Sequence, residues 1–353
     1  MDANVFLPAV TAVLAGIFFV ALLDQWRTRR RAYQSIWALG ILFFGIAVAC
    51  EAVAAAAGWS EPIYRLWYLT GAVWTAGWLG LGNAFLLGRT RFGFAFALCL
   101  FLAGLFTFLT ARRDPEIYAD ASTTAMLYFL VAGVLALAVS VETYFQNWRW
   151  PWMALLAVGG ATVLSIVLMA MAALPAPGYA LDPETGVPTA ELLPPELRLL
   201  TPFMNVTGAF ALILGALFSA YVFMPKRRVL EYSIDPNQPG DQFLFNLLIA
   251  PVAIVVNFVA SLPGALRALF TGRINSRVPA TLLIAIGAFI PAVTDSLNRF
   301  GSTEWFQLGK LLSVLFLLAG FLVSTETFSE IRVPFTKIVL WGRRTEAREA
   351  NGP

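Results

Sequence analysis

The sequence contains no histidine. Histidine is the usual haem ligand, the commonest metal ligand and the only side chain whose unperturbed charge changes near neutral pH. Its absence excludes a Ser-His-Asp triad, and the chain also lacks a glycine-rich phosphate loop and a Cys-x-x-Cys pair. The sequence therefore favours a non-enzymatic role. It predicts no catalytic residue, no metal ligand and no cofactor.

Cysteine and charged residues are also scarce. The two cysteines, Cys50 and Cys99, lie within apolar runs, so we expect small buried side chains and no disulfide framework. Charged residues make up 13% of the chain and hydrophobic residues 59%, far from the averages of soluble proteins. The basic residues cluster in short loops, as in membrane proteins of defined orientation. Membrane lipids are therefore the expected partners, and nucleic acid is not.

Long apolar runs fill most of the sequence. A helix needs about 20 residues to cross a hydrocarbon layer about 30 Å thick, because each residue adds about 1.5 Å. About nine runs of this length predict an all-α polytopic bundle of transmembrane helices. The predicted spans are 4–23, 33–57, 64–88, 92–110, 122–142, 151–173, 202–224, 279–298 and 305–327.

The distribution of basic residues predicts the orientation of the bundle. The first run has no basic residue before it and an arginine cluster, 27–31, after it, which is the reverse of a cleavable signal peptide. Basic residues then recur in alternate loops, whereas Arg112 and Arg113 are offset by acidic neighbours. Because cytoplasmic loops are enriched in Lys and Arg, we expect the N-terminus outside and the C-terminus inside.

Four regions are expected along the chain. Residues 1–228 form a seven-span bundle, 279–328 a two-span hairpin and 329–353 a basic tail at the membrane interface. Between them, 229–278 is a cytoplasmic-side insertion whose apolar part, 242–270, has basic residues on both flanks. Because both flanks favour the cytoplasm and two prolines interrupt the helical pattern, an in-plane helix or a re-entrant hairpin is preferred to a tenth span.

A ridge of small residues marks the third predicted span. Small side chains recur there at every fourth position, on one face of the helix. Such a ridge lets another helix approach closely, and packing drives helix association in lipid. It predicts either packing within the chain or self-association between copies. The ridge consists of Ala72, Ala76, Gly80, Ala84 and Gly88.

Three ionisable residues are predicted at similar depth in the outer half of the bundle. Glu51 lies about 9 Å below the outer boundary of its span by helical rise, and Asp295 and Lys310 fall at comparable depth on two neighbouring spans. A carboxylate in lipid is expected either to take up a proton or to pair with a cation, here Lys310 or Arg65. The cluster predicts a structural ion network, a proton or cation relay, or an anchor for a polar ligand head.

Pro291 belongs with this cluster. It cannot donate a hydrogen bond to the carbonyl of Gly287, so the eighth span should kink and expose polar backbone towards Thr294, Asp295 and Asn298. Broken helices of this kind line sites in many transporters.

Three segments carry a resemblance to a known family: 66–87, 198–223 and 279–335, the first reading LWYLTGAVWTAGWLGLGNAFLL. They resemble a family of uncharacterised bacterial multi-pass membrane proteins, which implies the bacterial cytoplasmic membrane and assigns no site residues. The first seven spans are also loosely similar to the seven-helix sensor modules that precede histidine kinase domains. The chain departs from that pattern because no kinase domain follows.

The function expected from these features is a non-catalytic membrane module, either an accessory or scaffold subunit or a sensor. It would act through helix packing with protein partners or with further copies of the chain. The alternative is a transporter or channel for a small or lipidic solute that uses the carboxylates of the outer half.

Overall fold

The computed structural model describes residues 3–183, 186–233, 240–271, 274–298, 303–324, 330–332, 336 and 339–342. Its helices are α1 (Ala3–Arg29), α2 (Ala32–Ala57), α3 (Glu61–Trp67), the π-helix η1 (Tyr68–Trp74), α4 (Thr75–Leu86), α5 (Phe92–Arg113), α6 (Pro115–Tyr118), α7 (Ser122–Tyr144), α8 (Trp150–Met171), α9 (Pro195–Phe223), α10 (Gly240–Phe270), α11 (Arg277–Asn298) and α12 (Thr303–Val323). Two short strands, β1 (Glu330–Arg332) and β2 (Val339–Gly342), pair antiparallel.

These elements confirm the expected all-α polytopic bundle. Eight helices are long and apolar enough to cross a membrane, judged by length and composition. The protein is therefore a multi-pass helical membrane protein. Every predicted span is helical, although α9 begins at Pro195 rather than at 202 and α12 ends at Val323 rather than at 327. The β hairpin lies within the predicted tail 329–353, most of which falls outside the described residues.

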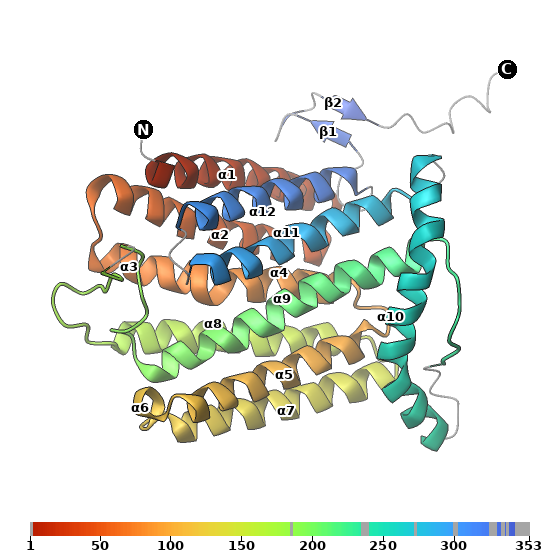
Figure 1. Cartoon of the computed structure of the whole chain (residues 1–353), viewed down its shortest axis with the longest axis horizontal. Coiled ribbons are helices and arrows are strands. Elements are labelled where there is room, and N and C mark those ends of the chain that lie inside the picture. The colour runs from red at the N-terminus through yellow and green to blue at the C-terminus, as the bar shows by residue number, and fades with distance from the viewer. Residues whose placement is uncertain are drawn as a thin grey trace.

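Most helices share one direction. Figure 1 shows α1, α2, α4, α5, α7, α8, α9, α11 and α12 running in parallel or antiparallel, with α10 lying across one end of them. That end, here called the α10 end, carries the turns 30–31, 87–91 and 145–149. The opposite end, here called the loop end, carries α6 and the connection between α8 and α9.

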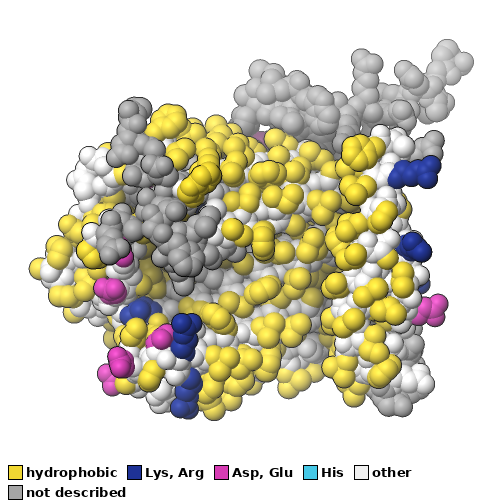
Figure 2. All heavy atoms as spheres, in the orientation of Figure 1, with side chains coloured by type: hydrophobic (Ala, Val, Ile, Leu, Met, Phe, Trp, Pro, Cys, Tyr) yellow, Lys and Arg dark blue, Asp and Glu magenta, His cyan; other side chains and the backbone are white. Residues whose placement is uncertain are grey.

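The lateral surface of the bundle is apolar. Figure 2 shows hydrophobic side chains over most of the visible face. Val134 and Leu137 of α7, and Leu156 and Val163 of α8, are more than 60% exposed. A soluble protein rarely exposes so large a contiguous apolar surface, whereas lipid tails solvate it without cost. These faces of α7 and α8 are suited to contact lipid.

Among the described residues the interior holds four packing clusters, of which two are large. The first, around Phe96, Leu100 and Trp150, joins α3, α4, α5, α7, α8 and α9. The second joins α1, α2, α11 and α12, and in it the ring of Phe321 lies 5.2 Å from Phe18 and 4.6 Å from Trp37, both edge to face. The predicted hairpin 279–328 therefore packs as part of the bundle, against the N-terminal helices.

The small-residue ridge is used inside the chain. A Cβ added at Gly80 would lie 2.4 Å from the carbonyl oxygen of Gly208 in α9, and one added at Gly208 would lie 2.1 Å from the carbonyl oxygen of Ala76. Backbones this close require glycine. Ala84 is fully buried, and Gly88 packs against Pro151 of α8. This face of α4 is thus occupied by α9 and α8 rather than presented to a second copy.

The segment 242–270 corrects one expectation. It forms a single helix, α10, and Pro251 and Pro263 lie inside it without dividing it, so a re-entrant hairpin is wrong for this segment. Leu244–Phe270 is long and apolar enough to span a membrane. However, Figure 1 shows α10 crossing the ends of the bundle helices rather than lying alongside them, which is the arrangement of an in-plane helix.

Polar side chains on the inner face of α10 hold it in place. Asn257 is fully buried, and its Oδ1 accepts hydrogen bonds from the backbone N–H groups of Val229 (2.7 Å) and Leu230 (2.9 Å). Its Nδ2 donates to the carbonyl of Leu230 at 2.8 Å. One turn on, Ser261 Oγ accepts from the N–H of Arg227 at 2.8 Å. The chain after α9 is therefore fixed to α10 by side-chain hydrogen bonds.

Candidate functional site

The candidate site lies near the loop end, where α2 and α12 come together. Lys310 Nζ lies 2.6 Å from each oxygen of the Glu51 carboxylate, and each of the two side chains is only 10% exposed. Glu51 is six residues from the end of α2, which places it about 9 Å below that end. The structure therefore brings together two of the three predicted ionisable residues as a buried ion pair.

Two further donors complete the surroundings of the carboxylate. The indole Nε1 of Trp67, at the end of α3, donates to Glu51 Oε1 at 2.8 Å. The amide Nε2 of Gln307, one turn before Lys310 on α12, donates to Glu51 Oε2 at 3.1 Å. The Lys310 ammonium also lies 3.8 Å from the centre of the Phe306 ring, close enough for a cation–π contact. Both oxygens of Glu51 are thus held by charged and neutral donors from two neighbouring helices.

Asp295 is the third predicted member. It lies on α11, and its side chain is outside the described residues. Its neighbour Thr294 packs closely on α12, because a Cβ added at Gly309 would lie 2.4 Å from Thr294 Oγ1. The backbone of α11 therefore passes beside Gly309, the residue that precedes Lys310.

Arg65, the other cation considered for Glu51, has different partners. Its Nη2 lies 2.7 Å from Glu61 Oε1, one turn earlier on α3. It also donates to the backbone carbonyls of Ala172, at 2.7 Å, and Met169. Arg65 therefore caps the end of α8 and does not take part in the Glu51 pair.

A stretch of π-helix follows directly on Trp67. In η1 the hydrogen bonds skip one residue more than in an α-helix, and the N–H of Thr75 accordingly reaches the carbonyl of Thr70. The hydroxyl of Thr75 bonds to the same carbonyl at 2.7 Å. π-Helical turns are rare and occur often at functional sites. Here the turn sets the direction in which Trp67 points relative to the ridge of α4.

The backbone gap left by Pro291 is filled by the neighbouring helix. The carbonyl of Gly287, which Pro291 cannot reach with an N–H, accepts a hydrogen bond of 2.7 Å from Ser313 Oγ of α12. Thr294 Oγ1 bonds back to the carbonyl of Ile290 at 3.1 Å. The carbonyl of Gly287, which was expected to be exposed, is therefore hydrogen-bonded by a side chain of α12.

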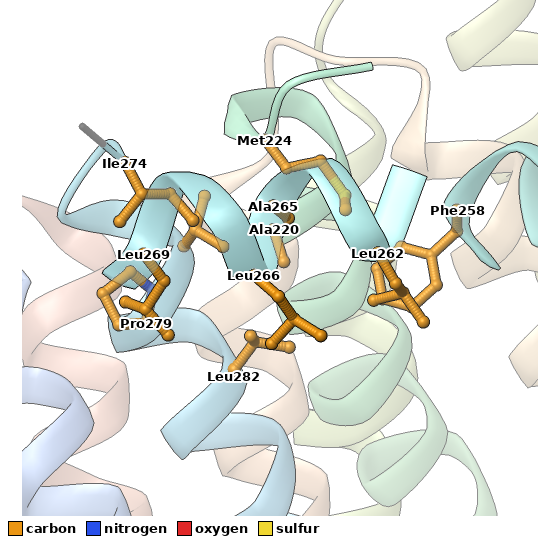
Figure 3. A pocket seen from close by; sticks show the side chains of 11 residues that line it. Ala220, Met224, Phe258, Leu262, Ala265, Leu266, Leu269, Ile274, Pro279 and Leu282 are labelled. Atoms are coloured by element: carbon orange, nitrogen blue, oxygen red, sulfur yellow. The ribbon is translucent and has the colours of Figure 1, made fainter. Parts of the chain in front are cut away.

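Two cavities of the described structure lie away from this site, since neither is lined by Glu51 or Lys310. One, of about 60 Å³, lies between α9, α10 and α11 and is lined by apolar side chains such as Phe258, Leu262 and Leu282 (Figure 3). This pocket offers no polar group to orient a ligand. The other lies at the α10 end and is described below.

Trp67 and Gln307 were not predicted as members of the site. Gln307 lies three positions before Lys310, so the i, i+3 spacing on one helix face was a signal that could have found it. Trp67 requires the relative placement of α2 and α3, which hydropathy does not supply.

Comparison of the chain with protein-family models, with curated proteins and with solved structures gives no match.

Proposed function

We propose that this protein is a non-catalytic integral membrane module, an accessory or scaffold subunit or a sensor, of the bacterial cytoplasmic membrane. Its α10 end would face the cytoplasm, because the basic loops around 27–31, 89–91 and 226–228 meet there. The resemblance to a family of bacterial multi-pass membrane proteins supports the membrane assignment alone, and the loose similarity of the first seven spans to sensor modules favours a sensor.

The observation that carries this proposal is the closed hydrogen bonding of Glu51. A carboxylate that relays protons or binds a solute must exchange partners with water or with that solute. Glu51 instead accepts from Lys310, Trp67 and Gln307, so α2, α3 and α12 are fastened together at one point. Buried polar groups paired in this way hold neighbouring helices in one register.

Carbodiimide labelling tests the proposal. These reagents modify carboxyl groups that are protonated and accessible from the membrane or from water. In the purified protein, Glu51 should stay unmodified, and Lys310→Met should make it reactive. Modification of Glu51 in the unaltered protein would argue against a structural clamp. Asp120, which is exposed in the turn between α6 and α7, provides a carboxyl control for reagent activity.

Orientation is tested separately by reporter fusions. Fusions after Arg277 and at Pro353 should both report the cytoplasm if α10 lies in the membrane plane and α11 and α12 both cross. An external signal at either position would overturn this topology.

The second candidate function is transport of a small or lipidic solute. It is favoured by the π-helix beside Trp67 and by Gln307 Oε1, which is buried without a hydrogen-bond partner among the described residues. Proteoliposomes loaded with a pH-sensitive dye and given an ion gradient would discriminate the two functions. Flux that disappears in Glu51→Gln would support transport, whereas flux equal to that of protein-free liposomes would support the module.

A further inference from the structure

A cleft of about 1200 Å³ opens at the α10 end, between three turns that are far apart in the sequence. Its walls come from the α1–α2 turn, the α4–α5 turn and the α7–α8 loop. This volume is large enough for a small ligand or a lipid head group. Unlike the apolar pocket beside α10, the cleft combines polar and apolar walls.

Arginine dominates the polar wall. Arg29, Arg31 and Arg89 all line the cleft, and none of the described residues that line it is acidic. Arg31 and Arg89 are exposed, so their guanidinium groups are accessible to a ligand. Guanidinium presents several N–H donors in a planar fork that matches the oxygens of phosphate. The charge and geometry of this wall therefore favour a phosphate-bearing anion.

Aromatic side chains also line the cleft, and one of them continues into the lateral surface of the bundle. Trp152 is 60% exposed, and its ring packs edge to face on Phe85 at 5.3 Å. One turn further along α8, Leu156 is 62% exposed on the same face. A ligand held by the arginines can thus extend an apolar tail from Trp152 along α8. A soluble phosphate compound would make no use of this wall.

Backbone conformation sets the cleft apart from the rest of the molecule. In the part of the chain that the structure describes, three non-glycine residues have positive φ: Arg30 (52°), Gln146 (56°) and Trp148 (56°). All three lie in the two connections that border the cleft, and Trp148 lines it. Such conformations are unfavourable for residues with a Cβ and cluster at functional sites.

We propose that this cleft is a binding site for an anionic phospholipid, with the phosphate held by Arg31 and Arg89 and an acyl chain lying along Trp152 and Leu156. Arg29, also at the cleft wall, adds positive charge. Basic pockets between transmembrane helices on the cytoplasmic side bind lipids in this manner. The site does not depend on whether Glu51 is a clamp or a transport residue, since the two lie at opposite ends of the bundle.

Native mass spectrometry of the full-length protein in detergent tests the site. Phosphatidylglycerol should bind at least about tenfold more tightly than phosphatidylcholine of the same chain length, because only the former carries net negative charge beside the arginines. Arg31→Gln combined with Arg89→Gln should abolish this preference. The matched control is Arg112→Gln combined with Arg113→Gln, a pair of exposed arginines at the loop end, which should leave the preference unchanged.

Two competitors distinguish a lipid from a soluble phosphate. Deacylated glycerophosphoglycerol and inorganic phosphate, each at the concentration of the lipid, should fail to displace phosphatidylglycerol. Displacement by either would overturn the lipid assignment in favour of a soluble phosphate ligand. Equal loss of lipid in both arginine pairs, or retention in both, would overturn the site itself. If the double variant fails to fold, Arg31→Lys combined with Arg89→Lys replaces it. This pair keeps both positive charges but removes the planar guanidinium donors, so it should weaken binding severalfold.

Discussion

The two ends of the bundle hold their charged residues in opposite ways. Near the loop end, Glu51 and Lys310 are buried, paired and surrounded by donors from neighbouring helices. At the α10 end, Arg31 and Arg89 line a wide cleft, and no acidic side chain is among the described residues of its walls. The charged residues near the loop end form a polar network that holds helices together, whereas those at the α10 end form a charged surface that can bind a ligand. Each of the following substitutions challenges that division.

The largest effect is expected from Lys310→Met. It leaves the Glu51 carboxylate buried without a cation, which should destabilise the protein by about 3–5 kcal/mol. Removing both charges, with Glu51→Gln added, should be milder than the sum of the single changes because the two groups interact. Thermal unfolding in detergent, read as a double-mutant cycle, measures this coupling. Additive effects would show that the pair does not stabilise the loop end.

The next effect concerns the middle of the bundle, where the small-residue ridge of α4 packs against α9. Gly208→Ala would place a Cβ 2.1 Å from the carbonyl oxygen of Ala76, so α4 and α9 must move apart at a cost of about 1–3 kcal/mol. Gly160→Ala is the control, because nothing lies within 4 Å of a Cβ at that position. Equal unfolding temperatures for the two variants would contradict the close approach.

A smaller and more local effect is expected at the α10 end from Asn257→Ala. The N–H groups of Val229 and Leu230 lose their acceptor, which should cost about 1 kcal/mol and release the chain after α9. Hydrogen exchange at these two amides should speed up, while exchange in the bundle helices stays unchanged. Gln242→Ala, on the exposed start of α10, serves as the control. Unchanged exchange at Val229 would show that Asn257 does not anchor this segment.

The smallest effect is expected from Arg31→Gln combined with Arg89→Gln. In lipid-free detergent, this change should shift stability by less than about 0.5 kcal/mol, because exposed surface positions contribute little. The same thermal unfolding experiment used for Lys310→Met provides the comparison. Destabilisation as large as that of Lys310→Met would mean that both ends use charge for folding.

Much of the fold follows from hydropathy and helical rise. Hydropathy locates the apolar helices, and helical rise places Glu51 and Lys310 at comparable depth on different helices. Their contact could be predicted because a carboxylate buried in the membrane is expected to pair with a cation. The participation of Trp67 could not be predicted, because it depends on how α3 is rotated relative to α2. The rotation of α3 relative to α4 also depends on η1, and no residue pattern in 68–74 signals a π-helix.

The cleft at the α10 end was also beyond the reach of the sequence. Its arginines were visible as orientation signals, but the cleft is assembled from turns separated by more than fifty residues each. Positive φ at Arg30, Gln146 and Trp148 is unexpected from residue type, since glycine occupies none of these positions. Likewise, Pro251 and Pro263 indicated a break in α10 that does not occur, because a helix can continue through proline when its other contacts hold it.

The π-helix η1 also has a consequence for the ways in which this sequence can change. A π-turn amounts to one extra residue inserted into an α-helix, and each residue of an α-helix accounts for about 100° of rotation. Because a π-turn takes up its extra residue without adding that rotation, deleting one residue from 68–74 would restore an ordinary helix and leave α3 at nearly the same angle relative to α4. Trp67 would still face Glu51, and Gly80 would still meet Gly208. Deleting one residue from 75–79, within α4, would instead rotate α3 by about 100° and turn Trp67 away from Glu51. The segment 68–74 is thus the part of this helix that can lose a residue while both contacts are kept.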